Sequence, residues 1–171
     1  HGIEKRFRNP PNQERGEDSD STTRILCVSR IAPYTNVWRV ASVAKKLYEQ
    51  GHSFVLNIVG PMRNINDECL QHFLDIVGKC PVINYEGAMP YTRMHDVYGN
   101  ADIFVFASSC ENCPNTLMEA MASGLSITCS DRGPMPEILG DAGVYFDPDD
   151  SASLESAIKK LLRDPNLRRD I

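Results

Sequence analysis

The sequence has no apolar run that approaches the roughly 20 residues of a membrane-spanning helix. It also lacks a surplus of positive charge, because its 18 Lys and Arg residues face 23 Asp and Glu residues and the net charge is −5. This balance, with a pI near 5.3, argues against a nucleic-acid-binding surface. The six cysteines do not form the pattern of a secreted disulfide scaffold, and we recognise no signal peptide, so we expect a cytoplasmic location.

What the chain does contain is the composition of an ordinary globular domain. Its 171 residues are 42% apolar and 24% charged, which suffices for one domain with its own core. The first 23 residues are instead polar, with a Pro-Pro pair at residues 10–11 and an acidic stretch at residues 17–20. We therefore expect an interdomain linker over residues 1–23 and one ordered domain over residues 24–171.

Short apolar runs and amphipathic segments alternate along the domain. The apolar runs predict strands at residues 24–30, 53–59, 82–86, 102–107, 125–129 and 143–146. Helical spacing of apolar residues predicts helices near residues 37–48, 69–77, 91–99, 114–123 and 154–162, the last stopped by Pro165. This alternation predicts an α/β fold, a Rossmann-like doubly wound parallel sheet of about six strands.

The expected topology also predicts where a ligand would bind. A doubly wound sheet commonly has the strand order 3-2-1-4-5-6, and its crevice opens between the carboxyl ends of strands 1 and 4. The predicted strand 1 ends at Arg30, and strand 4 leads into the polar loop at residues 108–115. The most unusual polar residues therefore gather where the topology places a site.

The helix that follows this loop has the features of an anion-binding N-terminus. Pro114 suits its first turn, because the missing N–H would have no intrahelical partner there. The amides of Asn115, Thr116 and Leu117 would then point out of the helix, where its dipole favours a phosphate. Arg30 can add a bidentate, permanently charged contact from the opposite wall.

Glu111 and Glu119 bracket the start of the same helix. Glu119 lies too close to a bound phosphate to be a natural phosphate ligand, but a carboxylate there suits the vicinal hydroxyls of a ribose. Glu111, in the loop ahead of the helix, would lie nearer to a distal sugar. Either acid alone would be interpreted as a solvated surface residue, and it is their joint context that favours a binding site.

Two further patterns have competing interpretations. Cys110 and Cys113 form a C-x-x-C motif, but zinc normally needs four ligands and the sequence has no second C-x-x-C or paired His motif, so we expect no metal site. A basic group near the C-terminus fits either a solvated helical face or a contact with a membrane or partner. That group consists of Lys159, Lys160, Arg163, Arg168 and Arg169.

One long stretch of the chain resembles a known family. It is ADIFVFASSCENCPNTLMEAMASGLSITCSDRGPMPEIL, followed by GDAGVYFDPDD and a helix beginning SLESAIKKLL, and it resembles the C-terminal donor-binding domain of a retaining, GT-B-fold glycosyltransferase of family 4. ILCVSRIAP resembles the first strand of that domain with its phosphate-contacting Arg. His1-Gly2-Ile3 with Phe7 resembles the segment that enters the domain. The Glu-x7-Glu spacing that continues as Glu-Ala-Met-Ala-Ser-Gly is the specific part, and the resemblance covers essentially the whole chain.

The resemblance implies a role for each candidate residue. Glu119 would bind the nucleotide ribose, and Glu111 would bind the transferred hexose and act with Arg30 in catalysis. Arg30 and the amides of residues 115–117 would hold the diphosphate. The base would lie near Gly60 and the loop after the third strand, around Gly87. The donor would be a UDP-, GDP- or ADP-sugar, with no cofactor and no metal.

The resemblance also implies an activity for the whole enzyme. A hexosyl group would pass from the nucleotide sugar to a hydroxyl acceptor, such as a polysaccharide or glycolipid. The acceptor-binding N-terminal domain would be missing from this chain, which alone would bind nucleotide but turn over little. Peripheral membrane association of the full-length enzyme is compatible with this activity. The alternative is a non-catalytic nucleotide-binding or regulatory module on the same fold.

The chain departs from the family at one position. The family usually has a Lys five or six residues after the Arg of the first strand, whereas this sequence has Thr35 and Asn36 there. A missing cation on the leaving diphosphate would cost transition-state stabilisation, so activity would be reduced. Arg39, one helical turn later, is a candidate substitute for that charge.

Overall fold

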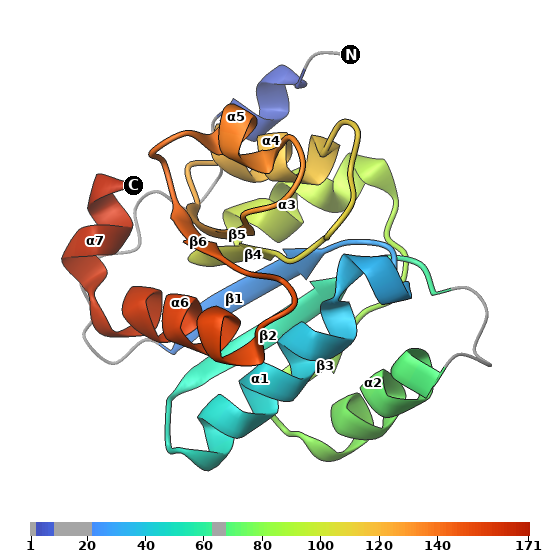
Figure 1. Cartoon of the computed structure of the whole chain (residues 1–171). Coiled ribbons are helices and arrows are strands. Elements are labelled where there is room, and N and C mark those ends of the chain that lie inside the picture. Colours follow the sequence, from blue (N-terminus) through green and yellow to red (C-terminus); the bar gives the residue numbers. More distant parts are fainter. Residues whose placement is uncertain (1–2, 9–21, 63–67) are drawn as a thin grey trace.

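The computed structural model describes residues 3–8, 22–62 and 68–171. Within these residues six strands form one parallel sheet of order β3-β2-β1-β4-β5-β6 (Figure 1). The strands are β1 (Thr23–Val28), β2 (Phe54–Val59), β3 (Ile83–Tyr85), β4 (Ile103–Phe106), β5 (Ser126–Ser130) and β6 (Val144–Phe146). This confirms the predicted α/β fold class, and the expected strand order is also correct.

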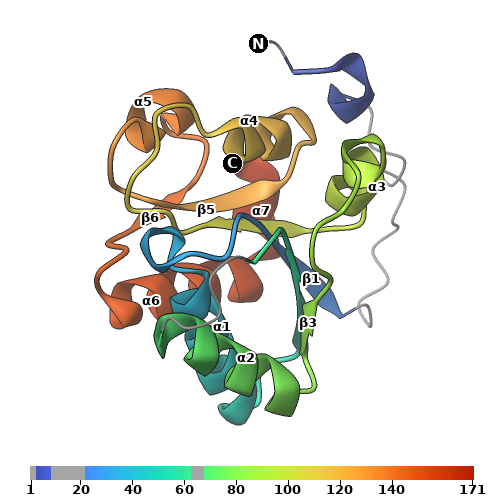
Figure 2. The same ribbon diagram turned by 90° about the vertical axis from the view of Figure 1, so that its right-hand side faces the viewer.

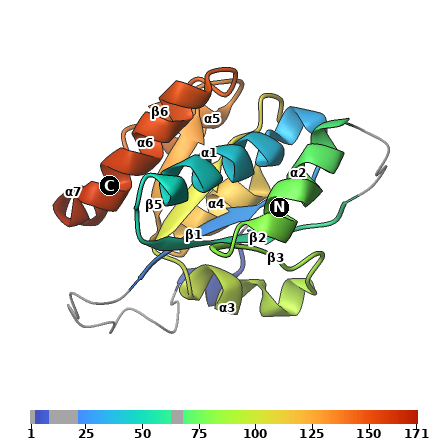
Figure 3. The same cartoon turned by 90° about the horizontal axis from the view of Figure 1, so that it is seen from below.

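Helices cover both faces of the sheet (Figure 2). One face carries α1 (Val37–Glu49), α2 (Glu68–Lys79) and α6 (Ser151–Arg163), with α1 lying between the other two (Figure 3). The other face carries α3 (Met94–Gly99), α4 (Asn115–Ala122) and α5 (Met135–Leu139), and α7 (Pro165–Asp170) ends the chain. Short 3-10 turns occur at η1 (Lys5–Arg8), η2 (Pro33–Thr35) and η3 (Tyr91–Arg93). No described helix is both long and apolar enough to cross a membrane.

Successive side chains of the central strands enter two separate cores. Ile25 and Cys27 of β1 pack beneath α1, whereas Leu26 and Val28 pack beneath α3 and α4. All four residues of β4 are buried as well. A parallel sheet that is covered on both faces has this pattern, which is why its strands appear as continuous apolar runs in the sequence. Burial raises the pKa of the Cys27 thiol to about 12, so this cysteine is a packing residue.

The C-terminal helix prediction needs a correction. α6 ends at Arg163, and Pro165 does not stop the helical region but begins a second helix, α7. The Asp164 carboxylate makes this change of direction favourable, because it accepts hydrogen bonds from the amides of Asn166 and Leu167 at 3.0 and 2.9 Å. Proline at the first helical position is compatible with a new helix start, and the sequence contained that signal.

Part of the segment predicted to be a linker packs on the domain. Phe7 of η1 is fully buried, and its ring lies 5.8 and 5.7 Å from the rings of Tyr91 and Tyr98. Residues 1–2 and 9–21 of that segment lie outside the described residues. Whether residues 1–23 connect two domains stays a prediction, but Phe7 and the partly buried Ile3 contribute to the core on the α3 and α4 side.

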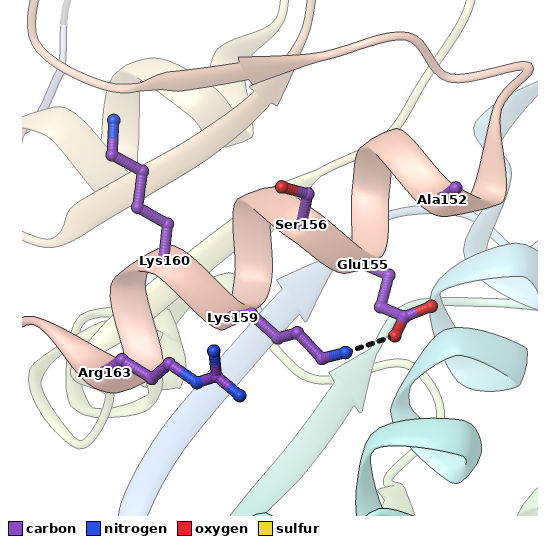
Figure 4. A pocket seen from close by; sticks show the side chains of 6 residues that line it. All are labelled: Ala152, Glu155, Ser156, Lys159, Lys160 and Arg163. Carbon is purple, nitrogen blue, oxygen red and sulfur yellow. Dashed lines mark hydrogen bonds and ion pairs between the residues drawn. The ribbon is translucent and has the colours of Figure 1, made fainter.

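A charged group joins α1 to α6, and Figure 4 shows the part of it that lies on α6. Glu155 of α6 is only 8% exposed, and its carboxylate pairs with Lys159 on the same helix and, at 2.7 Å, with Lys46 of α1. Gln50, which follows α1, donates a third contact at 3.2 Å. The hydrogen bonds from Lys159 and Lys46 lower the pKa of Glu155 from 4.5 to about 2. Lys160 and Arg163 belong to the same basic face, whose membrane contact stays a prediction.

We predict that Glu155 makes the domain more stable above pH 4.5 than at lower pH. Because its folded pKa is lowered, its contribution is complete above the unfolded pKa of 4.5 and is lost as pH falls toward 2. Glu155→Gln should therefore flatten the acid side of a plot of unfolding temperature against pH. Glu49→Gln is the matched control, because the exposed ion pair of Glu49 with Lys45 has an N–O distance of 3.8 Å. Equal flattening by both changes would contradict the prediction.

Candidate functional site

A cleft of about 270 Å³ lies at the carboxyl ends of β1 and β4, where the winding of the sheet reverses. Arg30 and Glu111 line it from opposite loops, and Asn115 and Thr116 line it from the first turn of α4. The structure thus brings together four residues that the sequence selects from positions far apart in the chain.

Arg30 lies in a loop whose backbone is fixed by hydrogen bonds. The N–H of Ser29 donates to the carbonyl of Val59 at 3.0 Å, which continues the pairing of β1 with β2 past the last strand residue. The hydroxyl of Thr35, a residue only 3% exposed, lies 2.8 Å from the carbonyls of both Arg30 and Ala32. Its single proton can serve either acceptor, so Thr35 closes the loop around the base of the Arg30 side chain.

Asn36 ties the Arg30 loop to the Glu111 loop. Its side-chain amide donates to the carbonyl of Ala107 at 3.0 Å and to the hydroxyl of Ser109 at 2.6 Å. The N–H of Ser109 in turn donates to the carbonyl of Tyr34 at 2.9 Å. Asn36 has a φ of 54°, a left-handed conformation that Asn tolerates better than most residues. Thr35 and Asn36, which occupy the positions of the expected lysine, therefore both serve the loop structure.

Arg39, the candidate substitute for the missing lysine, does not line the cleft. Its guanidinium stacks on the ring of Trp38 at 4.6 Å and donates to the Asp149 carbonyl at 3.2 Å and the Ser151 hydroxyl at 3.3 Å. The side chain is thus bound at the start of α6 and is not part of the cleft wall. Among the described residues that line the cleft, Arg30 is the single permanently charged base.

The N-terminus of α4 differs in detail from the prediction. Pro114 precedes the helix, with φ −78° and ψ 77°, and is not in the first turn. Its carbonyl accepts a hydrogen bond from the N–H of Leu117 at 3.0 Å, and the N–H of Asn115 donates to the backbone carbonyl of Cys113 at 2.9 Å. Two of the three selected amides therefore have protein acceptors in this conformation, and the side chain of Leu117 is fully buried. Phosphate binding by Asn115, Thr116 and Leu117 stays a prediction.

Glu119 does not line the cleft with Glu111. It is only 5% exposed, and its Oε2 lies 3.0 Å from the hydroxyl of buried Tyr98. Burial raises the pKa of Glu119, while hydrogen bonding from Tyr98 and Tyr91 and the charge of Arg6 oppose this shift. The two acids thus lie in different environments, and the roles expected for Glu111 and Glu119 stay predictions.

Gly60 and Gly87 lie at the carboxyl ends of β2 and β3 and are joined to each other. The N–H of Gly60 donates to the carbonyl of Gly87 at 2.8 Å, and the Tyr85 hydroxyl donates to the carbonyl of Gly60 at 3.0 Å. Gly60 has a φ of 149°, and a Cβ atom there would lie 1.8 Å from the carbonyl oxygen of Ser29. Only glycine permits this close approach, which aligns the ends of three strands along one edge.

Three residues at or beside the site have roles that the sequence does not predict. Tyr34 lines the cleft and is 47% exposed, but no pattern distinguishes it from other loop tyrosines. Asn36 carries no signal other than its tolerance of positive φ, and Tyr98 resembles an ordinary apolar position of its helix. Each acts through contacts with residues distant in sequence, so none is visible in a local motif.

Groups of three or more His, Cys, Asp or Glu side chains arranged to hold a metal ion do not occur in the described ranges. Cys110 and Cys113 are both exposed free thiols in the loop ahead of α4, and Cys113 lines the cleft. The C-x-x-C motif is therefore placed beside Glu111 and not within a cluster of metal ligands.

The profile of one protein family matches nearly the whole chain. The family is described as "Glycosyl transferases group 1", and the match extends over residues 10–171. The chain belongs to this family. Its six-stranded parallel sheet with flanking helices matches one half of a GT-B fold.

Two curated relatives illustrate the range of the family. An O-antigen chain mannosyltransferase B from Escherichia coli is 30% identical over 111 residues, which cover 65% of this chain and 29% of the relative. A sulfoquinovosyl transferase, SQD2, from Arabidopsis thaliana is 28% identical over 152 residues, 86% of this chain and 28% of the relative. This group 1 chain therefore spans less than a third of the length of either transferase.

Solved structures share its fold. A C-terminal domain of a group 1 glycosyl transferase, LpcC from Francisella tularensis, superposes with a TM-score of 0.81 at 20% identity, covering 98% of this chain and 91% of that one. Anabaena HepE, solved in complex with UDP and glucose, gives a TM-score of 0.75 at 15% identity, covering 86% of this chain and 40% of that one. At such identities the likeness concerns the fold alone.

We predict that Gly60→Ala destabilises this group 1 domain by about 3 kcal/mol or more, because the added Cβ clashes with backbone and the positive φ disfavours an L side chain. Gly78→Ala in α2 is the control, since nothing lies within 4 Å of its Cβ position. That change should stabilise the helix by about 0.5–1 kcal/mol. Urea denaturation measures both, and a Gly60 variant as stable as the wild type would contradict the proposed close approach.

Proposed function

We propose that this chain is the donor-binding domain of a retaining, family 4 glycosyltransferase. The full enzyme would transfer a hexosyl group from a UDP-, GDP- or ADP-sugar to a hydroxyl acceptor such as a polysaccharide or glycolipid. The observation that carries the proposal is the cleft in which Arg30 faces Glu111 and the first turn of α4. A carboxylate, a guanidinium cation and a helix N-terminus meet there, at the point where the strand order of the sheet reverses.

The cleft suits the chemistry of a leaving nucleoside diphosphate. As the sugar–phosphate bond breaks, negative charge grows on the diphosphate, and a preorganised cation stabilises it without reorganisation. Arg30 supplies that cation, and Thr35 fixes the backbone from which its side chain extends. Glu111 lines the cleft from a loop that continues into α4, and its carboxylate would accept hydrogen bonds from sugar hydroxyls. No cofactor is required by this division of roles.

The nucleoside would extend from the cleft along the carboxyl edge of the sheet. Gly87 leaves space beside the backbone for a base, because nothing lies within 4 Å of its Cβ position, and Gly60 is joined to it by a backbone hydrogen bond of 2.8 Å. Main-chain groups there suit UDP, GDP or ADP alike. Glu119, one turn further along α4, would accept hydrogen bonds from the ribose hydroxyls. The acceptor would bind to an N-terminal domain that is not part of this chain. The donor-binding domain alone should therefore bind the nucleotide sugar but catalyse little transfer. A membrane-bound acceptor would bring the full enzyme to a membrane surface.

A non-catalytic nucleotide-binding or regulatory module is the second candidate function. The specific observation in its favour is that Thr35 and Asn36 are both committed to loop contacts, which leaves Arg30 as the single base on the described cleft wall. Nucleotide binding is common to both functions. Assaying hexosyl transfer by the two-domain protein separates them, because only the enzyme turns over.

We predict that Glu119→Ala weakens binding of the preferred nucleoside diphosphate by about tenfold, the value of a hydrogen bond to a charged group. Glu111→Ala should change nucleotide affinity by less than about threefold and mainly reduce transfer by the two-domain protein. Calorimetric titration with UDP, GDP and ADP measures affinity and base preference together. Exposed Glu137→Ala in α5 is the control, and equal losses from both acidic variants would contradict the division of roles.

We also predict that Arg30→Ala weakens nucleoside diphosphate binding by about thirtyfold but leaves the affinity for the matching nucleoside within about twofold, because the guanidinium contacts only the phosphates. Arg39→Ala removes a cation that is bound at α6 and serves as the control. If the Arg30 variant lost affinity for the nucleoside and the nucleoside diphosphate equally, the diphosphate would not bind at Arg30 and the prediction would be wrong.

A further inference from the structure

The hydroxyl of Tyr98 lies close both to the turn of α4 that lines the cleft and to Glu119, which does not line it. Its oxygen lies 3.0 Å from Oε2 of Glu119 and 3.2 Å from the carbonyl oxygen of Thr116. Thr116 belongs to the turn of α4 that lines the cleft, and Glu119 lies one turn further along the same helix. One hydroxyl on α3 is therefore within reach of both the proposed phosphate-binding turn and the proposed ribose-binding acid.

The single proton of this hydroxyl favours the carboxylate. A phenol has one hydrogen to donate, and an ionised carboxylate is a stronger acceptor than a peptide carbonyl. The Thr116 carbonyl then keeps the hydroxyl oxygen close to α4 without being its main acceptor. Burial raises the pKa of Tyr98 itself, so the group remains a protonated donor at any working pH.

Packing prevents the Tyr98 ring from moving away. The side chain is fully buried, and its ring lies 5.7 Å from the ring of Phe7, edge-on, and 5.7 Å from the tilted ring of Phe104. Phe7 comes from η1 at the start of the chain, and Phe104 comes from β4. The position of the hydroxyl is thus set by three elements of the core and not by a flexible surface contact.

Three elements place charged or titratable groups against Glu119. Tyr98 comes from α3, Tyr91 comes from η3, and Arg6 and Glu4 come from the first described segment. Burial and Glu4 raise the pKa of Glu119, whereas the two hydroxyls and Arg6 lower it. Arg6 is itself held by the Glu4 carboxylate at 2.9 Å and lies 4.9 Å from the centre of the Tyr91 ring. A carboxylate that binds two ribose hydroxyls must be ionised, so these groups decide whether it can do so.

We propose that Tyr98 is a positioning residue of the donor site. Its hydroxyl holds one oxygen of Glu119, so that the other oxygen is presented to the ribose of a nucleoside diphosphate. The inference rests on the proposed ribose role of Glu119 and goes beyond it, because it assigns a role to a side chain that touches no substrate. It also gives residues 4–8 a part in the site, since Phe7 supports the ring that carries the hydroxyl.

Tyr98→Phe tests this with little disturbance of the core, because it removes one oxygen and keeps the ring. Tyr145→Phe is the matched control, since the Tyr145 hydroxyl also donates a hydrogen bond, to the carbonyl of Gly140 at 2.7 Å, but outside the site. Two quantities are measured in each variant: the pKa of Glu119, by NMR of its side-chain carboxyl carbon with Glu119→Gln for assignment, and the affinity for UDP, GDP and ADP between pH 5 and 8.

Removing the hydroxyl should raise the pKa of Glu119 and weaken binding of the preferred nucleotide by about tenfold. Because binding needs ionised Glu119, affinity should fall as pH is lowered, and the fall should begin at a higher pH in Tyr98→Phe than in the wild type. Tyr145→Phe should match the wild type in both measurements.

Either of two results would overturn the role of Tyr98. One is an unchanged Glu119 pKa in Tyr98→Phe, whatever the affinity. The other is a raised Glu119 pKa with nucleotide affinity equal to that of the Tyr145 control. A wild-type chain that binds none of the three nucleotides would instead overturn the proposed function, and the pKa comparison would still measure the hold of Tyr98 on Glu119.

Discussion

The candidate site depends on the pairing of β1 with β4, where the winding of the sheet reverses direction. The loops after these two strands diverge to opposite faces, and hydrogen bonds from Asn36 and Ser109 hold them at a fixed separation. Arg30 stands on one loop and Glu111 on the other, so their spacing is set by the backbone. The first turn of α4 then has one position relative to both, which is the preorganisation that stabilising a developing charge requires.

The residues that fix this spacing, Thr35 and Asn36, occupy positions where a lysine could supply charge. A lysine at position 35 would lose the hydroxyl that bonds the Arg30 loop, and a lysine at position 36 would lose the amide that reaches Ala107. The chain thus combines a rigid loop with a single base on the described cleft wall. Whether that base suffices for transfer separates the proposed enzyme from the alternative binding module.

Much of the fold was predictable because burial on both faces leaves a strong pattern. The strands appear as continuous apolar runs, and α1 and α6 show clear helical spacing. The start of α7 at Pro165 was misread, because the capping contacts of Asp164 decide it. In the site, Arg30 and Glu111 were predictable from topology. Tyr34, Asn36 and Tyr98 were not, since their roles arise from contacts between distant segments. The sequence also gave no sign that Glu119 is buried against residues 4–8.

We propose that a nucleotide sugar binds along the carboxyl edge between β1 and β4. Backbone NMR of the chain, titrated with UDP, GDP and ADP, can locate the binding site because every amide reports separately. We expect the preferred nucleotide to shift the amide signals of Arg30, Thr116 and Gly87 most strongly. Shifts confined to the basic face of α6, around Lys160 and Arg163, would contradict it.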